Sequence, residues 1–373
     1  MQFDRRQSES LATRANEDTA EATRAPLSVG VVSDDGFAST IASAIVAKLP
    51  DHAVIDGERR EIRVSGASVP LPPTATGAAP LGQWLASVKA DAEYDIVLCV
   101  SEVPRRQGSR PVIAETRDGT TGALYVPSFG TLAVRRRAVA AALAVLHELI
   151  EADASSRLPR RYFESRWASS DSGEGDEVLL TSSIFGRIRL VSGMIRCNRP
   201  WRLVPTLSSA LAAASAASAF GVFYASIWQM AASMSLGRLA MIGVTAVIAM
   251  TVWVILPNGL WEKRTFRRST IDRWMYNAAT VGTVLTGALC MYALLFAVVL
   301  SSAAVVISPE FLAAQIGRPS SIGDYFSLAW LAASLGTVAG AVGSSVADRE
   351  DILDATYGHR ELIRRQSATA SSS

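Results

Sequence analysis

Two hydrophobic patterns divide the chain. Residues 26–154 alternate short β-branched apolar runs with stretches whose apolar residues recur three and four positions apart, as in "LSVGVV" followed by "FASTIASAIVAKL". The short runs predict strands and the wider spacing predicts helices. Residues 203–347 instead contain long segments without any charged side chain. The pattern therefore predicts a folded α/β domain in water, followed by a helical region that is surrounded by lipid.

The N-terminal pattern predicts specific elements. We expect strands at "LSVGVV", "AVIDG", "EIRVSG" and "YDIVLCVSE", two more around the Asp118-Gly119 turn, and helices at "FASTIASAIVAKL", "LGQWLASVKADA" and "LAVRRRAVAAALAVLHELIEA". Strands that alternate with helices favour an α/β fold, here a Rossmann-like sandwich with a mainly parallel sheet. About 130 residues are enough for such a domain to have a core of its own.

The C-terminal pattern predicts an all-α bundle of four transmembrane helices, at about 203–228, 239–257, 278–307 and 325–347. Each uncharged segment supplies the roughly 20 apolar residues that cross about 30 Å of hydrocarbon. Four such segments in succession are not typical of a soluble core. We therefore expect a multi-pass protein whose main partner is the lipid bilayer.

The distribution of basic residues predicts the orientation of these helices. Three flanks are rich in them: Arg187, Arg189, Arg196, Arg199 and Arg202 before the first span, Lys263, Arg264, Arg267, Arg268 and Arg273 between the second and third, and Arg349, Arg360, Arg364 and Arg365 after the fourth. The other two connections hold only Arg238 and Arg318. Segments rich in Lys and Arg that flank transmembrane helices usually lie on the cytoplasmic side. We therefore expect a plasma-membrane protein with cytoplasmic N- and C-termini.

The segments between and beyond these domains are polar or amphipathic. We expect a disordered tail at 1–25, a flexible acidic linker at 155–177, an amphipathic interfacial helix at 178–197 and a cytosolic tail at 348–373. In the helix, Leu180, Ile184, Ile188, Val191 and Ile195 recur at helical spacing. Such a helix lies at the membrane surface, where Arg187, Arg189, Arg196, Arg199 and Arg202 would contact anionic lipid headgroups.

Composition excludes several classes of function. The net charge of +2 on 373 residues leaves no overall signature of nucleic-acid binding. The three histidines and three cysteines are scattered, so we expect neither a metal site nor disulfides. The chain contains no glycine fingerprint for a dinucleotide or a phosphate loop, and we predict no cofactor. The N-terminus has no apolar region that would make it a signal peptide.

Two polar clusters follow predicted strands. Ser33, Asp34, Asp35 and Gly36 come after "LSVGVV", and Ser101 and Glu102 end "YDIVLCVSE". Ligands of open α/β sheets bind at the carboxyl ends of the strands, so these six residues are the candidate ligand site. Two alternatives remain open. Ser33, Asp34 or Asp35 can simply cap the next helix. Alternatively, the carboxylates of Asp34, Asp35 and Glu102 can together hold a divalent metal.

The predicted spans carry small residues rather than ionisable ones. Ser208, Ala212 and Ala216 recur four apart in the first, as do Gly336 with Gly340 and Ala339 with Gly343 in the fourth. Such spacing lets helices approach closely, either within one bundle or across a homo-oligomer or membrane-protein interface. The absence of charged residues from the spans disfavours an ion-coupled transporter.

Four stretches together resemble a known family: "YDIVLCVSEVPRR…RPVIAE", "SFGTLAVRRR", "RPWRLVPTLSSALAAA" and "YNAATVGTVLTGAL". They are similar to a family of uncharacterised actinobacterial multi-pass membrane proteins, and the resemblance covers nearly the whole chain outside the tails. It implies a cytosolic α/β domain, a variable linker and four spans. It implies no particular activity.

Three hypotheses about function follow. The first is a non-enzymatic scaffold, or a protein that senses a ligand or partner through its cytosolic domain. The second is a membrane-tethered enzyme with a nucleotide-like or cofactor pocket at the strand ends. The third is a transporter of an uncharged or lipidic substrate.

Overall fold

The computed structural model describes residues 25–55, 58–69, 78–150, 161–162, 165–170, 176–182, 184–261 and 270–343. These residues form two compact units, which we describe separately. The first unit is the sheet domain. The second contains the remaining helices together with two short segments, Glu102–Pro104 and Pro127–Leu132. The predicted tails at 1–25 and 348–373 lie outside the described residues, except for Ala25.

The first unit is built on a sheet with the order β2-β3-β1-β4-β7-β6-β10-β9-β8, and β5 pairs with β6. The strands are β1 (Leu27–Ser33), β2 (His52–Ile55), β3 (Glu58–Ser68), β4 (Ile96–Ser101), β5 (Arg106–Gln107), β6 (Arg110–Arg117), β7 (Thr121–Tyr125), β8 (Arg161–Tyr162), β9 (Ser165–Ser169) and β10 (Glu177–Leu180). Every strand predicted from the sequence is present.

The sheet is mixed, so the prediction of a mainly parallel sheet was wrong. Only the central pairs β3–β1, β1–β4 and β4–β7 are parallel. The other described pairs, β2–β3, β5–β6, β6–β7, β6–β10, β9–β10 and β8–β9, are antiparallel. Parallel neighbours need a long crossover, whereas a tight turn joins antiparallel ones. The turn between β6 and β7 is such a connection, with positive φ at Asp118 and Gly119.

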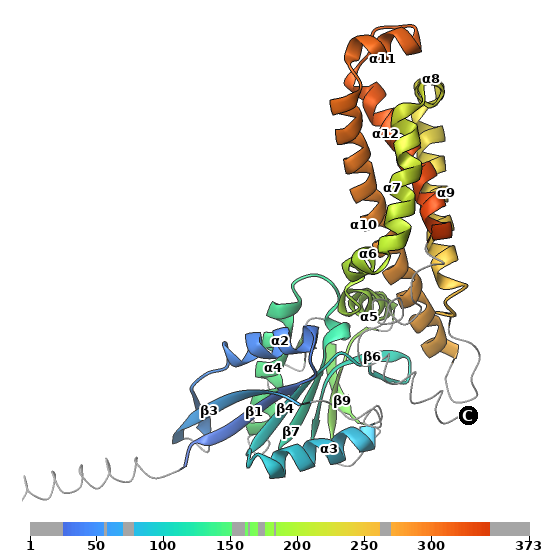
Figure 1. Ribbon diagram of the computed structural model, residues 1–373. Coiled ribbons are helices and arrows are strands. Elements are labelled where there is room, and N and C mark those ends of the chain that lie inside the picture. Colours follow the sequence, from blue (N-terminus) through green and yellow to red (C-terminus); the bar gives the residue numbers. More distant parts are fainter. Residues whose placement is uncertain are drawn as a thin grey trace, which may run out of the picture. The chain divides into compact units, whose positions relative to one another are not determined.

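Helices cover both faces of this sheet, as Figure 1 shows. They are α2 (Phe37–Val46), α3 (Ala78–Asp91) and α4 (Val134–Ile150), and a short 3-10 helix, η1 (Val126–Phe129), follows β7. Leu81 and Leu85 of α3 pack on Val97 and Ala123 in the core of one face. On the other face α2 packs beside α4, and Gly122 of β7 makes room for Val145 of α4. The unit is therefore a three-layer α/β/α sandwich.

Part of the predicted linker and interfacial helix belongs to the sheet. We expected loop at 155–177 and helix from residue 178, but β8, β9 and β10 occupy the described part of this stretch. Val178, Leu179 and Leu180 are buried in β10, which lies between β6 and β9. Three consecutive apolar residues suit a strand buried on both faces as well as a helix, so periodicity alone misassigned them. The rest of the linker, including 171–175, lies outside the described residues.

The second unit is helical. Its elements are α5 (Ile184–Cys197), η2 (Pro200–Arg202), α6 (Leu203–Thr206), α7 (Ser208–Phe223), α8 (Ala225–Ser233), α9 (Leu236–Ile255), α10 (Thr270–Val306), α11 (Pro309–Ile316) and α12 (Ile322–Gly343). In Figure 1, α7, α9, α10 and α12 lie side by side. Among the described residues, α9, α12 and residues Arg273–Val306 of α10 are long and apolar enough to cross a membrane.

A fourth crossing exists only if a bent pair of helical segments is counted as one span. That pair is Ile184–Thr206 with Ser208–Phe223, which meet at 57°. The break falls at Leu207, whose φ of −90° and ψ of 37° lie outside the helical region. The first predicted span, 203–228, also ends early, since Tyr224 is extended and α8 starts after it. The bounds of the other three spans shift by several residues, most at α10, which begins at Thr270 instead of 278.

Close packing of α7 against α12 uses glycines. A Cβ at Gly336 would lie 2.5 Å from the carbonyl oxygen of Ala214, and one at Gly340 would lie 2.7 Å from that of Ala210. Gly343 faces Ala213, whereas Ala339 is only partly buried. The glycines Gly336, Gly340 and Gly343 of α12 therefore pack against α7 of the same chain. This contact does not address whether the chain forms oligomers.

The packing face of α7 is not the predicted one. Ser208, Ala212 and Ala216 are exposed, and the face that meets the bundle carries Ala210, Ala214, Ser218 and Gly221. Both sets have small residues four apart, so the spacing was informative but the choice of face was not. A helix made almost entirely of small and apolar residues does not indicate its inner side by amphipathicity.

The N-terminal end of α10 extends along α5. Leu190 and Met194 of α5 form a buried cluster with Met275 and Ala279 of α10. The 37 residues of α10 correspond to roughly 55 Å, well beyond about 30 Å of hydrocarbon. One end of α10 therefore projects past the apolar layer of any bilayer that the bundle crosses.

Candidate ligand groove between α2 and α4

The sheet brings part of the predicted site together. β1 and β4 are adjacent and parallel, with Ser33 opposite Val100, so the loops after these strands start at the same edge. Ser33 and Ser101 are buried, however, and Asp34 is nearly so. Asp35 is exposed and accepts a hydrogen bond of 2.5 Å from the Ser68 hydroxyl. The edge therefore offers little accessible polar surface.

The two alternatives for these residues were a helix cap and a divalent-metal site, and the structure bears on both. Gly36, with φ of 124°, is the N-cap residue of α2, rather than Ser33, Asp34 or Asp35. Glu102 belongs to the second compact unit, whereas Asp34 and Asp35 belong to the first. Within the described ranges, no group of three or more His, Cys, Asp or Glu side chains is placed to hold a metal ion.

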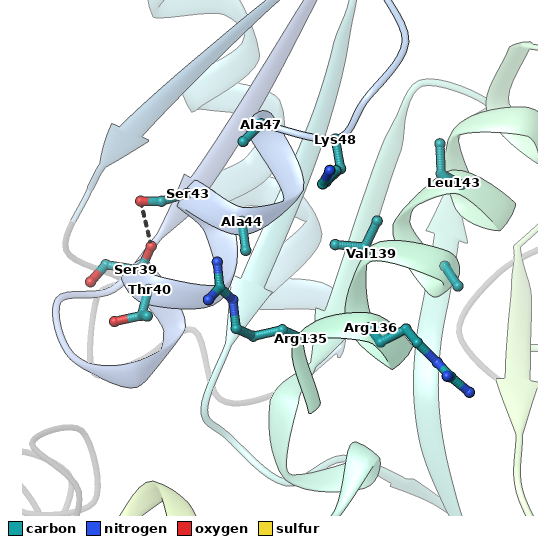
Figure 2. Close-up of a pocket in the computed structure, with 11 residues that line it drawn as sticks. Ser39, Thr40, Ser43, Ala44, Ala47, Lys48, Arg135, Arg136, Val139 and Leu143 are labelled. Carbon is teal, nitrogen blue, oxygen red and sulfur yellow. Dashed lines mark hydrogen bonds between the residues drawn. The ribbon is translucent and has the colours of Figure 1, made fainter. Parts of the chain in front are cut away.

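An open groove lies elsewhere, between α2 and α4, and has a volume of about 820 Å³. Ligand pockets are usually about 300–1,000 Å³. Figure 2 shows its walls. The lining residues are Ser39, Thr40, Ser43 and Ala44 from α2, Ala47 and Lys48 from the turn that follows it, and Arg135, Arg136, Val139, Ala140 and Leu143 from α4. We call this the α2–α4 groove.

The ionised groups that line the α2–α4 groove are all cationic. Arg135 extends from α4 toward α2, Lys48 stands on the facing wall, and Arg136 points away from α2 (Figure 2). No acidic side chain is among the described residues that line it. Three hydroxyls also line the groove, although Ser39 and Ser43 already donate to the carbonyls of Gly36 and Ser39, each at 2.9 Å. The groove is thus suited to an anion.

The position of the arginines does not serve the stability of the helix. Arg135 and Arg136 are in the first turn of α4, which contains no acidic residue. That end of a helix carries the positive end of its dipole, where cations are unfavourable. A bound anion would offset this repulsion.

A second cavity, of about 420 Å³, continues the groove along α4. The two cavities share Ala140 and Leu143. The remaining lining residues of the second are Pro50, Ala53, Val54, Ile62, Ala144, Leu146, His147 and Ile150, which are apolar except for His147. We call it the apolar extension. The whole depression is therefore cationic toward one end and apolar toward the other.

One part of this site stands out in the sequence. The run Arg135-Arg136-Arg137 by itself is compatible with a solvated surface, or with a contact for headgroups or for the acidic linker. Lys48 and the hydroxyls of α2 gave no signal, because only the packing of α2 beside α4 sets them opposite the arginines. The pairing of helices on one sheet face decides such a site.

A cluster of charged and polar side chains lies on the opposite face of the sheet, under α3. Glu115 of β6 is 1% exposed, and its Oε1 accepts from Tyr125 Oη at 2.7 Å and from Arg117 Nε at 3.1 Å. Arg105 lies 3.8 Å from the other carboxylate oxygen. Burial, followed by the charge of Glu115, raises the pKa of Tyr125 well above its usual 10.0.

This cluster also includes Asp176, just before β10. Burial raises the pKa of the Asp176 carboxyl from its usual 3.8, although nearby Arg117 acts in the opposite direction. Arg117 in turn lies against Gly82 of α3, where a Cβ would approach its guanidinium to 3.0 Å. The cluster ties α3, β6, β7 and β10 together and lines none of the grooves described above. We assign it a structural role.

Comparison with family models, with curated proteins and with solved structures finds no match to this chain. The resemblance to an actinobacterial membrane family therefore stays a prediction.

Proposed function

We propose that the chain is a multi-pass protein of the plasma membrane that acts as a ligand or partner sensor through its cytoplasmic α/β domain. The α2–α4 groove is the proposed binding site. An anionic group is the proposed ligand, held by Lys48 and Arg135. The single observation that supports this role is a groove whose ionised lining groups are all cationic and which contains no acid among its described residues.

Membrane insertion is supported by the outward faces of the helical unit. Large apolar side chains such as Val244, Trp253, Leu294, Val298 and Val338 are exposed along α9, α10 and α12. Soluble monomers rarely expose contiguous apolar surfaces of this extent. Lipid is the solvent that makes such a surface favourable. We propose four crossings, the first formed by the C-terminal part of the bent pair, residues 203–223, while its N-terminal part, α5, stays outside the hydrocarbon.

The proposed orientation follows the arginine distribution. Arg196 stacks over the Trp201 ring at 4.8 Å, and Arg202 is exposed beside it. An arginine with an adjacent exposed indole suits the cytoplasmic headgroup layer. On the opposite side, Arg318 is paired with Asp324 at the start of α12. This supports cytoplasmic termini.

We propose that α5 lies in the same interface. Ile184, Phe185 and Ile188 are 68%, 75% and 64% exposed on this helix. Of the predicted stripe, Val191 and Ile195 instead pack toward α10. The exposed apolar residues at the start of α5 would insert among the headgroups, with Arg187 and Arg189 nearby.

Insertion and orientation can be tested together. The full chain should stay in the membrane fraction after alkaline extraction, and a reporter fused at residue 1 should be active only inside the cell. Release from the membrane, or a reporter active outside, would refute this part of the proposal.

Anion binding is tested on the full chain in phosphatidylcholine nanodiscs with inorganic phosphate as the probe. We expect millimolar phosphate to slow hydrogen exchange in α2 and α4, and Lys48→Glu with Arg135→Glu to abolish the effect. Arg110→Glu is the matched control, because Arg110 is an exposed arginine on β6 outside the groove. Protection that survives the double change would locate the anion elsewhere, and no protection in the wild type would refute the anion site.

A further inference from the structure

We infer that the ligand of the α2–α4 groove is a single-chain anionic amphiphile, with its head at Lys48 and Arg135 and its chain in the apolar extension. This inference rests on the proposed function and specifies the chemical class of the ligand. Fatty acids and alkyl phosphates belong to that class.

Continuity of the two cavities is the first argument. They share Ala140 and Leu143, so a ligand that starts between the helices can continue along α4 without leaving the protein surface. The cation walls lie at the 820 Å³ end, and the 420 Å³ end is lined by Val54, Leu143 and Ile150. Apart from His147 in the apolar extension, the ionisable lining groups therefore lie in the α2–α4 groove, as the charge of an amphiphile lies at one end.

Exposure of apolar side chains is the second argument. Val54 is 62% exposed and Leu143 is 38% exposed, and both line the apolar extension. Covering them with an alkyl chain removes apolar surface from water, which favours binding in proportion to the area covered. A simple inorganic anion would leave these two side chains in water.

Charge selects the head group. Lys48, just after α2, and Arg135 of α4 line facing walls of the groove, and no acidic lining residue competes for them among the described positions. An anionic head therefore meets only cations among the ionised lining groups, whereas a neutral alcohol of the same chain length gains no charge interaction from them. The same chain with a positive head would be repelled.

The test compares three probes on the full chain in phosphatidylcholine nanodiscs: decyl phosphate, inorganic phosphate and decanol. Binding is measured by calorimetry against empty nanodiscs, and the site is mapped by hydrogen exchange in α2 and α4. We expect decyl phosphate to bind at least about tenfold more tightly than phosphate, because its chain covers apolar surface. We expect decanol to give no protection in α2.

Two sets of variants separate head from chain. Lys48→Glu with Arg135→Glu should abolish binding of both phosphates, and Arg110→Glu should leave both unchanged. Val54→Ser changes an exposed side chain that lines only the apolar extension, and it should reduce the advantage of decyl phosphate by about threefold with phosphate binding unaffected.

Each outcome has a distinct meaning. If phosphate and decyl phosphate bind equally, the amphiphile is refuted while the anion site of the proposed function stands. If neither binds, both proposals are refuted. If decyl phosphate binds but protects other segments, or still binds to the Lys48→Glu and Arg135→Glu variant, the placement in this groove is refuted.

Discussion

The phenol of Tyr125 donates a hydrogen bond of 2.7 Å to the buried Oε1 of Glu115. The two residues belong to neighbouring antiparallel strands, β7 and β6, and the same oxygen also accepts from Arg117. Burying a carboxylate this deeply is costly unless its oxygens accept hydrogen bonds. The pair therefore holds the centre of the cluster beneath α3.

Removal of this hydroxyl should destabilise the sheet domain. We expect Tyr125→Phe to lower the free energy of unfolding by about 1.5–3 kcal/mol, the usual range for a hydrogen bond to a charged group. The measurement is hydrogen exchange in β6 and β7. Tyr94→Phe is the matched control, because the Tyr94 hydroxyl bonds only to an exposed Ser65 hydroxyl, at 3.0 Å, in the described structure. Equal losses in the two variants would contradict the prediction.

The same tyrosine should give the domain an alkaline pH dependence. Because the folded state raises the Tyr125 pKa above 10.0, it favours the protonated phenol. That contribution is complete below pH 10.0 and is lost as the pH rises toward the folded pKa. Stability of the wild type should therefore fall more steeply above pH 10.0 than that of Tyr125→Phe, measured by chemical denaturation across this range. Parallel pH profiles would show that the phenol does not titrate between the two states.

Asp176 should make the stability of the sheet domain depend on pH in the acidic range. Its pKa is raised from 3.8 in the folded protein, so the folded state favours the protonated carboxyl, and this contribution is lost as the pH rises above 3.8 through the folded pKa. We expect Asp176→Asn to cost no stability at neutral pH and to flatten the loss of stability that follows pH 3.8. Denaturation curves of both proteins from acid to neutral pH check this. A variant that is less stable at neutral than at acidic pH would contradict it.

The contact between α7 and α12 can be tested with single methyl groups. A methyl at Gly336 would meet the Ala214 carbonyl at 2.5 Å as well as the Ser218 hydroxyl, so Gly336→Ala should destabilise the bundle by about 1–3 kcal/mol. Thermal unfolding in detergent measures the loss. Gly237→Ala in α9 is the control, since a Cβ there meets nothing within 4 Å. A Gly336→Ala protein as stable as the control would show that the helices are farther apart.

The sequence predicted the order of elements in the first unit better than their arrangement. Apart from the short β5 and η1, the strands and helices from Leu27 to Ile150 leave a local mark, such as the β-branched run in β1 or the positive-φ pair Asp118-Gly119 after β6. Strand direction leaves none, because it depends on which distant strand supplies the partner. β10 shows this most clearly: its pairing with β6 joins residues far apart in the chain.

The candidate site was harder to predict for a related reason. Buried Ser33 and Ser101 resemble a ligand rim in sequence, because residues after a parallel strand often line one. Only the packing of the loops shows that these side chains are covered. Arg135 and Lys48 are far apart in the chain, and their relation depends on two helices that share a sheet face.

The length of α10 has a mechanical consequence. A continuous helix bends little unless its hydrogen-bond ladder is broken, and α10 keeps helical structure from Thr270 to Val306. If a thinner or thicker bilayer changed the tilt of the apolar part of α10, the N-terminal end of the helix would therefore be displaced with it. Because Met275 and Ala279 at that end are buried against Leu190 and Met194, such a displacement would also move α5.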